Sequence, residues 1–365
     1  MAIPLVEPFR ISSGEVRLKE SLLLRVEGEG AFGWGESSAM PGAFYSKETP
    51  GSCQQSLLDA LLPAVVGRRF ESVIHLESCL RALSSNRFAR VAVETAAFEL
   101  IAFQQNLSVR ELLGLPAIEP IPCGLAIGLY DREADLIAAI HRHWPGNYQR
   151  LKIKIEPGHD IAPVRAVRAE FGEIPLFVDA NAAYTRNDFP TLERLDGYGL
   201  MMIEQPLAKD DMDGAALLQR RLHTPVCLDE SVETAADARR AIGLGACRIV
   251  NIKLQRVGGF LEALRIMKIC TEAGISLWLG TMPELGVGTA QLLALAGHSG
   301  IGFPTDAHPS SRWFADDVLK PEIKFNGGGL RLPAGPGLGY EVDESKVSRF
   351  RVNTWRMGAA ARPLA

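Results

Sequence analysis

Five charged residues stand at nearly constant spacing in the middle of the chain, each at the end of a short apolar run. They are Lys154, Asp179, Glu204, Asp229 and Lys253, separated by 25, 25, 25 and 24 residues. One strand–helix unit of a (β/α) barrel has about this length, so consecutive units would place the five side chains around one rim. Active sites of such barrels lie at that rim, which makes these residues candidates for chemistry.

The three acidic members of this series indicate a metal site. Carboxylates that converge on a barrel mouth repel one another unless a cation neutralises them. A set of oxygen ligands that leaves room for waters and substrate suits Mg²⁺, with Mn²⁺ as the alternative. We therefore predict that Asp179, Glu204 and Asp229 bind the metal. In the alternative interpretation, each carboxylate caps a helix or pairs with a lysine.

Lysines flank the predicted metal on both sides. Lys152 and Lys154 stand two residues apart, so both point to the same face of one strand, whereas Lys253 comes from the sixth strand. Two ammonium groups that face each other over a divalent cation should have lowered pKa values, because nearby positive charge disfavours protonation. A lysine with a lowered pKa can act as a base near neutral pH. The sequence thus predicts one base on each face of a metal-bound substrate.

This arrangement suits the removal of a proton from the carbon next to a carboxylate. The product is an enolate with two negative charges, and a divalent cation on the carboxylate oxygens stabilises the charge that develops in the transition state. Return of the proton on the opposite face racemises or epimerises the substrate. If the substrate carries a leaving group on the β carbon, the same enolate reacts by elimination.

The elements that must position these residues alternate regularly from about residue 119 onward. Short apolar runs that predict strands cover residues 122–127, 151–155, 176–179, 201–204, 226–229, 248–253, 276–280 and 301–305. Amphipathic segments such as 160–171 and 259–273 lie between them and predict helices. Eight strands separated by helices favour a closed parallel α/β barrel of the TIM type, with an open doubly wound sheet as the alternative.

The first 118 residues follow a different pattern. Strand formers at 21–27 and 31–35 flank a turn that contains Gly28, Gly30 and Gly33. This spacing matches the dinucleotide-binding fingerprint, which requires a helix after the glycines, but the chain continues as a strand and therefore predicts a hairpin. Helical periodicity follows at residues 55–66, 74–84 and 90–105. We predict an α+β capping domain over residues 1–118, a barrel over 119–320 and a C-terminal segment, 321–365, that returns to the capping domain.

Composition excludes several classes of function. The 365-residue chain has 39 Lys and Arg against 43 Asp and Glu, a formal net charge of −4, so it lacks the basic face of a general nucleic-acid binder. No apolar run approaches the length of a membrane span, and no secretory signal is expected. Six scattered cysteines predict reduced, mostly buried thiols in a cytoplasmic protein. The expected partner is a small-molecule carboxylate, neither nucleic acid nor membrane, and a homo-oligomer is left open.

At these residues the sequence resembles the enolase superfamily in its muconate-lactonising subgroup. The matching motifs are Lys152-Ile153-Lys154, Val178-Asp179-Ala180-Asn181, Ile203-Glu204-Gln205-Pro206, Leu228-Asp229-Glu230-Ser231 and Asn251-Ile252-Lys253. The resemblance implies a modified TIM-type barrel beneath a two-part capping domain. It also implies a divalent metal and lysine bases, a pairing already known for that superfamily.

Three further stretches are similar to o-succinylbenzoate synthases and the related N-succinylamino acid racemases. They are residues 41–49, 282–288 and 310–313. This resemblance implies that the acid/base pair is Lys154 and Lys253. It implies that the residues assisting near the substrate carboxylate are Lys152 and Asn181. The loops over the mouth would be residues 12–20 and 41–48. A synthase of this kind would act in menaquinone biosynthesis.

Four positions bear on the identity of the substrate. Ala126 stands at the end of the first strand, where the resembled enzymes place a serine, so a possible hydrogen bond to the acyl or aromatic group is lost. Glu284 is predicted to bind substrate, with a supporting role behind the site as the alternative. Asp306 either reaches the mouth or forms a turn, and His308 is expected in a loop or at the surface.

Other functions remain as alternatives. On the same framework these are muconate cycloisomerisation and dipeptide epimerisation, although Asp306-Ala307-His308 matches the acidic motif of the epimerases only loosely. From a different class, a metal-free aldolase would use Lys253 to form a Schiff base, but the three carboxylates would then have no purpose. A non-catalytic binding protein is the last alternative.

Overall fold

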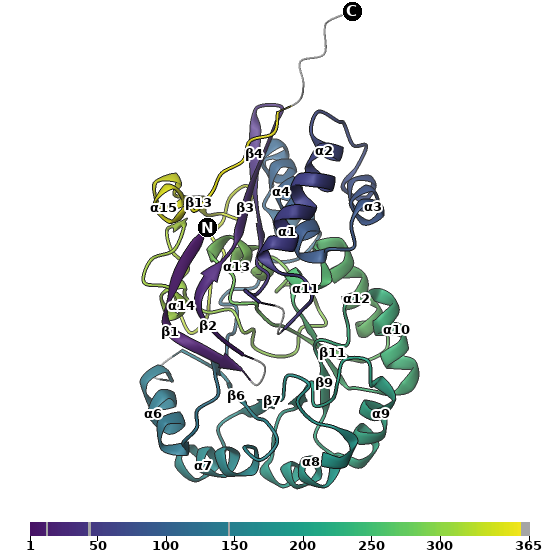
Figure 1. Cartoon of the computed structure of the whole chain (residues 1–365), viewed down its shortest axis with the longest axis vertical. Helices are drawn as coiled ribbons and strands as arrows, with labels where there is room; N and C mark the ends of the chain where they lie inside the picture. The colour runs from purple at the N-terminus through teal and green to yellow at the C-terminus, as the bar shows by residue number, and fades with distance from the viewer. Residues whose placement is uncertain (12–13, 43–44, 145–146, 359–365) are drawn as a thin grey trace, which may run out of the picture.

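The computed structural model describes residues 1–11, 14–42, 45–144 and 147–358 of the chain. Figure 1 shows a ring of strands with helices on its outside in the lower part of the view, and the N-terminal strands and helices above it. The predicted architecture, a modified (β/α) barrel with an α+β capping domain, is confirmed.

Seven parallel strands form the barrel sheet, in the order β11-β10-β9-β8-β7-β6-β5. Their bounds are β5 (Leu125–Ile127), β6 (Leu151–Lys154), β7 (Leu176–Asp179), β8 (Ile203–Glu204), β9 (Val226–Leu228), β10 (Ile249–Ile252) and β11 (Ser276–Leu279). Each lies within a predicted strand. Nearly all of their residues are buried, because helices cover the outer face of the sheet and side chains fill its inside.

Helices connect successive strands around the outside of the ring. The connecting helices are α6 (Glu133–His143), α7 (Ile161–Phe171), α8 (Phe189–Leu195), α9 (Met212–Arg221), α10 (Ala235–Leu244) and α12 (Phe260–Glu272). The predicted helices at 160–171 and 259–273 correspond to α7 and α12. The other helices of this part of the chain are α11 (Leu254–Val257), α13 (Gly286–Leu293) and α14 (Ser310–Trp313).

The eighth barrel unit differs from the prediction, because residues 301–305 form isolated bridges and no regular strand. Ile301 bridges to Leu277 of β11, and Thr305 bridges to Cys123 just before β5. Pro304 lies inside this segment and has no N–H to donate, which prevents a continuous ladder. The two bridges nevertheless join the edges of the curled sheet, so the ring is closed on the eighth side.

A fully buried arginine fills the inside of the barrel below its mouth. Arg150 Nη2 donates to Asp306 Oδ1 at 2.6 Å and to the Pro304 carbonyl oxygen at 3.1 Å. Its guanidinium carbon lies 4.7 Å from the centroid of the Phe177 ring, within cation–π range. A Cβ atom on Gly124 would lie only 2.3 Å from Arg150 Nε, so only glycine fits beside this side chain.

The capping domain begins with two antiparallel strand pairs. The strands are β1 (Ala2–Ile11), which pairs with β2 (Gly14–Glu20), and β3 (Leu22–Gly28), which pairs with β4 (Ala31–Ser37). The second pair is the predicted hairpin, and Glu29 and Gly30 take the positive φ angles, 50° and 81°, that a two-residue hairpin turn requires. The expected loop at residues 12–20 is wrong for residues 14–20, which form β2. Residues 12–13 and 43–44 lie outside the described part.

Helix α4 (Arg87–Gln105) is the longest helix of the capping domain and packs against β4. Asn86 caps its first turn by accepting the N–H of Ala89 at 2.8 Å. Glycine in β4 lets the helix approach closely, because a Cβ on Gly35 would lie 1.8 Å from the carbonyl oxygen of Ala92. The other helices here are α1 (Pro50–Ser56), α2 (Leu62–Val65), α3 (Val73–Leu83) and α5 (Val109–Leu112), with a π-helical turn at Leu57–Leu61.

The C-terminal segment contacts the capping domain. Its elements are β12 (Leu319–Lys320), β13 (Glu341–Val342) and α15 (Glu344–Phe350). Gly337 N–H donates to the carbonyl oxygen of Leu107 at 2.9 Å. Arg25 Nη1 of β3 donates to Glu344 at 2.9 Å. The segment therefore packs against β3 and the end of α4 in the capping domain.

Two expectations drawn from composition can be compared with the described residues. All six cysteines lie in the described part, none forms a disulfide, and five of the six are buried. In the ranges that the structure covers, no helix combines the length and the apolar character that crossing a membrane demands.

A buried carboxyl group on α4 joins the capping domain to the tail. Glu99 accepts the backbone N–H of Trp34 at 2.5 Å and that of Leu338, and burial raises its pKa from 4.5 to about 7. Between these two pH values the folded protein binds more protons than the unfolded chain. The free energy of unfolding therefore falls as pH rises through this window.

We expect Glu99→Gln to remove this pH dependence, because the amide oxygen still accepts an N–H and carries no charge. The free energy of unfolding of Glu99→Gln relative to the wild type should rise by about 2 kcal/mol between pH 5 and pH 8. Urea unfolding of both proteins at the two pH values measures this difference. A difference that stays constant would show that Glu99 does not titrate in this range.

Candidate active site

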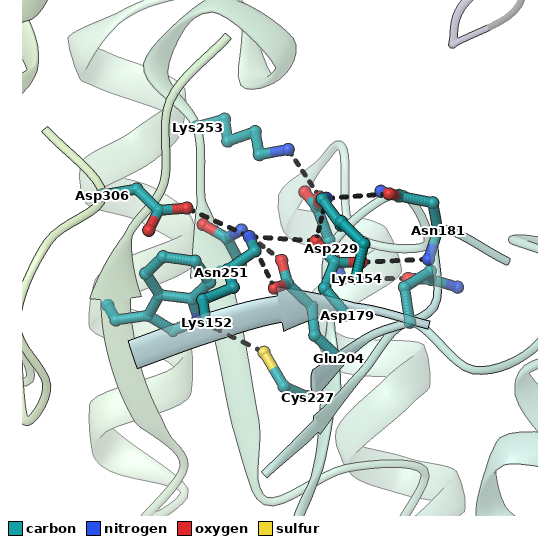
Figure 2. A network of polar contacts seen from close by, with 12 residues as sticks. Lys152, Lys154, Asp179, Asn181, Glu204, Cys227, Asp229, Asn251, Lys253 and Asp306 are labelled. Carbon is teal, nitrogen blue, oxygen red and sulfur yellow. Dashed lines mark hydrogen bonds and ion pairs between the residues drawn. The ribbon is translucent and has the colours of Figure 1, made fainter. Parts of the chain in front are cut away.

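The structure brings the predicted charged residues together at the carboxyl ends of the barrel strands (Figure 2). Each side chain comes from a strand or from the residue directly after it. The group consists of Lys152 and Lys154 on β6, Asp179 on β7, Glu204 on β8, Asp229 after β9 and Lys253 after β10. All six residues are buried, with at most 7% of their surface exposed. The regular spacing in the sequence therefore corresponds to one shared rim.

Lys152 lies among three carboxylates. Its Nζ is 2.9 Å from Asp179 Oδ2, 2.9 Å from Glu204 Oε2 and 3.0 Å from Asp306 Oδ2. Burial acts to lower the pKa of Lys152, but Asp179 and Asp306 outweigh it and raise the pKa well above the ordinary value. Lys152 is therefore a fixed cation, suited to attract a carboxylate and unsuited to act as a base.

Lys154 contacts the same oxygen of Asp179 as Lys152 does. Its Nζ donates to Asp179 Oδ2 at 2.6 Å and to Asn181 Oδ1 at 2.8 Å. Burial lowers the pKa of Lys154, and the positive charge of Lys152 adds to this effect against the attraction of Asp179. The predicted direction is confirmed for this lysine. Asn181 takes a positive φ of 43°, which an asparagine tolerates better than most residues.

Lys253 lies across the cluster and has its own carboxylate. Its Nζ is 2.7 Å from Asp229 Oδ2 and donates to the hydroxyl of Tyr45 at 3.0 Å. Burial acts to lower the pKa of Lys253, but Asp229 and then Tyr45 raise it well above the ordinary value. The prediction of a lowered pKa is therefore wrong for Lys253 in this arrangement. The cause is a carboxylate partner that it shares with no other lysine.

The three carboxylates, Asp179, Glu204 and Asp229, suit a hard divalent cation. Ion pairs with lysines neutralise much of the charge of these carboxylates in this arrangement. Among the described residues, no three His, Cys, Asp or Glu side chains form a ready metal-ligand set. The alternative expectation, that the carboxylates pair with lysines, is thus also observed. Two buried oxygens, Glu204 Oε2 and Asp229 Oδ1, nevertheless accept no well-formed hydrogen bond within the described residues and only meet the cations of Lys152 at 2.9 Å and Arg256 at 3.0 Å. Burial, followed by the charge of Asp179, raises the pKa of Glu204 to about 8, a cost that a bound cation would relieve.

A pocket opens above this cluster between the barrel and the capping domain, and it encloses about 430 Å³ including its mouth. The charged floor contains the three lysines described above, with Asn181 and Asp306. The walls are mostly apolar and come from both domains: Phe9, Ile11, Met40, Tyr45, Ala126, Thr281, Met282, Pro283 and Trp313. A substrate with a carboxylate at the floor and an apolar or acyl portion toward the walls fits this division.

The remaining predicted positions differ in their placement. Asp306 reaches the pocket. His308 lies in a loop, as expected, but it is 3% exposed and packs between Tyr148 and Trp313, so the alternative of a surface position is wrong. Glu284 is not part of the pocket lining. It lies behind the pocket close to Glu36, and burial raises its pKa to about 7. This placement agrees with the supporting role that was the alternative for Glu284.

Sequence reasoning did not single out two side chains that contact Asp229. Tyr45 belongs to the segment 41–49, but nothing in its local pattern indicates a contact with residues almost two hundred positions away. Arg256 Nε lies 3.0 Å from Asp229 Oδ1 and is 2% exposed. The sequence does contain a signal for Arg256. It follows Lys253 by three residues at the start of a helix, and residues three apart on a helix lie on the same face, so both side chains can reach one site.

Comparison with known proteins agrees with this geometry. Residues 2–114 match the family described as mandelate racemase / muconate lactonizing enzyme, N-terminal domain, and residues 135–346 match the enolase C-terminal domain-like family. The chain is 40% identical to an o-succinylbenzoate synthase of Geobacillus stearothermophilus, over 96% of this chain and 93% of that protein. It is 41% identical to an N-succinylamino acid racemase of Amycolatopsis, over 92% of this chain and 91% of that protein.

Solved structures show the same fold. An enolase-superfamily member from Listeria innocua has a TM-score of 0.90 and 36% identity, covering 96% of this chain and 94% of that one. The muconate lactonizing enzyme of Pseudomonas fluorescens, solved with muconolactone, has a TM-score of 0.90 and 26% identity, covering 96% of each chain. Together with the carboxylates and lysines at the barrel mouth, these matches lead to one conclusion: the chain belongs to the enolase superfamily, with both the N-terminal and the C-terminal domain of the mandelate racemase / muconate lactonizing enzyme group.

Proposed function

We propose that this protein removes a proton α to a carboxylate with the help of Mg²⁺, as an o-succinylbenzoate synthase, an N-succinylamino acid racemase, or both. The observation that carries the proposal is the placement of Lys154 and Lys253, on β6 and after β10, at either side of the strands that bear the three carboxylates. The similarity to a synthase and to a racemase supports the same chemistry.

The residues divide the work by charge and position. Asp179, Glu204 and Asp229 would hold the cation, which supplies positive charge to the substrate carboxylate as the enolate forms. Lys152, fixed by Asp306 at 3.0 Å, adds a permanent positive charge beside it. In racemisation, Lys154 and Lys253 would remove and return the proton on opposite faces. For Lys253 this requires a cation on Asp229, whose positive charge would offset the attraction that raises the pKa of this lysine. In dehydration, one lysine removes the proton and returns it to the departing hydroxyl while the other stabilises the enolate.

The pocket favours a substrate without a free ammonium group. Asp306 is the carboxylate of the pocket lining, and it already pairs with Arg150 at 2.6 Å and Lys152 at 3.0 Å. A dipeptide with a charged amino group would find no unpaired carboxylate among the described lining residues. An N-acylated amino acid or a dicarboxylate avoids this cost, which supports the synthase and racemase over a dipeptide epimerase.

A Schiff-base mechanism is disfavoured by the surroundings of Lys253. The carboxylate nearest to it, Asp229 at 2.7 Å, and the neighbouring Asp179 and Glu204 would have no role in a metal-free aldolase. Treatment with borohydride in the presence of a keto acid tests this alternative. We expect no covalent adduct on Lys253, as judged by peptide mass spectrometry.

The experiment that tests the proposal is solvent exchange in D₂O. The protein with Mg²⁺ or Mn²⁺ should incorporate deuterium at the α carbon of an N-succinylamino acid, dehydrate the cyclohexadiene precursor of o-succinylbenzoate, or do both. NMR follows the first reaction and ultraviolet absorbance the second. Chelation of the metal should abolish activity, and addition of Mg²⁺ should restore it. If neither substrate reacts with either metal, the proposal is wrong.

Three wider expectations belong to the same proposal. A synthase would act in menaquinone biosynthesis, in the cytoplasm, on a small carboxylate with no nucleic acid or membrane partner. A homo-oligomer is the remaining open expectation, and analytical ultracentrifugation of the purified protein distinguishes it from a monomer.

A further inference from the structure

The two groups that hold Lys253 come from different domains. Asp229 follows β9 in the barrel, whereas Tyr45 belongs to the capping domain and lines the pocket. The Tyr45 hydroxyl accepts from Lys253 Nζ at 3.0 Å and donates to Asp229 Oδ2 at 3.4 Å. The same ammonium lies 4.9 Å from the centroid of the Tyr45 ring. Its third N–H has no partner among the described residues, and it is the one left to point at a substrate.

Lys154 is held in a parallel way, but entirely by the barrel. Its partners are the Asp179 carboxylate at 2.6 Å and the Asn181 amide oxygen at 2.8 Å. For both lysines the carboxylate partner is one of the residues assigned to the cation. The uncharged partner is therefore the holder that does not also bind the cation. For Lys253 alone, that holder is a side chain of the capping domain, Tyr45.

We propose that Tyr45 is a positioning residue for Lys253, whose hydroxyl holds the lysine amine toward one face of the substrate. This inference rests on the proposed function, in which each lysine serves one face. A lysine amine sits on a flexible four-carbon stem, so it needs a fixed contact to stay at attack geometry. In the described part of the chain, Tyr45 is the one uncharged side chain bonded to Lys253. Docking of the capping domain thereby completes one of the two bases.

The test compares the two enantiomers of an N-succinylamino acid. Lys154→Ala and Lys253→Ala first identify which enantiomer each lysine deprotonates, by deuterium exchange without inversion. Tyr45→Phe keeps the ring and removes the hydroxyl. It should slow exchange of the enantiomer served by Lys253 about tenfold, the loss expected for one hydrogen bond to a charged group, and change the other by less than about twofold. Tyr340→Phe is the control, because this hydroxyl bonds to the Arg331 carbonyl oxygen in the tail.

The asymmetry between enantiomers is the deciding result, since a general loss of structure would slow both. Equal slowing, slowing only of the enantiomer served by Lys154, or unchanged exchange would each overturn the role of Tyr45. Tyr45→Leu also removes the ring, and it should show the same asymmetry or a larger one. If the wild-type protein with Mg²⁺ exchanges neither enantiomer, the proposed function itself fails. A symmetric response in an active protein rejects only the positioning role.

Discussion

Lys154→Ala is expected to reduce racemisation or dehydration by about a thousandfold or more, because it removes the proposed base for one substrate face. The fold should survive, since Asp179 keeps its contact with Lys152 at 2.9 Å and its buried charge stays paired. Circular dichroism and the melting temperature check the fold, and kcat/KM from polarimetry or absorbance gives the activity. Single-face exchange of the enantiomer served by Lys253 should persist.

A lysine on the outside of the same barrel gives the matched control. Lys209 is 61% exposed in its side chain and lies 3.7 Å from Glu233, away from the pocket lining. Lys209→Ala should leave kcat/KM within about twofold, because an exposed ion pair contributes little. If Lys154→Ala retained turnover near the wild-type level, Lys154 would not be the base.

Glu204→Gln is expected to weaken Mg²⁺ binding by at least about a hundredfold, because it removes one of the three proposed charged oxygen ligands. The amide oxygen can still accept from Asn251 Nδ2, which donates to Glu204 Oε1 at 2.7 Å. Lys152 keeps two other carboxylates nearby, so the cluster stays paired. Isothermal titration calorimetry measures the affinity, and the rise in melting temperature with added Mg²⁺ should disappear in this variant.

Glu99→Gln supplies the comparison for this variant. It makes the same carboxyl-to-amide change at a buried residue of the capping domain, far from the barrel mouth, and should leave Mg²⁺ affinity unchanged. Equal Mg²⁺ affinity in Glu204→Gln and the wild type would remove Glu204 from the ligand set.

The barrel could be predicted because its signals are local. Each strand is a short apolar run, and each functional side chain stands where such a run ends, so the spacing of Asp179, Glu204 and Asp229 reports the repeat of the fold directly. The strand predicted for the eighth unit does not form, and the reason is physical. Residues 301–305 are apolar enough to predict a strand. Pro304 has no N–H, however, so the segment cannot complete a hydrogen-bonded ladder.

The contacts between domains could not be read in the same way. The position of Tyr45 against Lys253 depends on how the capping domain docks, and no periodicity in the sequence encodes that. The predicted direction of the pKa shift of Lys253 is wrong because the neighbouring ammonium groups affect this lysine less than the carboxylate closest to it, Asp229 at 2.7 Å. Both errors concern pairs that form only in the folded chain.

The guanidinium of Arg150 lies beneath the barrel mouth and connects position 124 with the floor of the pocket. Arg150 occupies the space in which a side chain at position 124 would begin, and it also holds Asp306, which in turn holds Lys152. A methyl group on Gly124 would push the arginine aside and release this chain of contacts toward the floor of the pocket. Among natural variants of this protein, a larger residue at position 124 should therefore occur only together with a smaller residue at position 150.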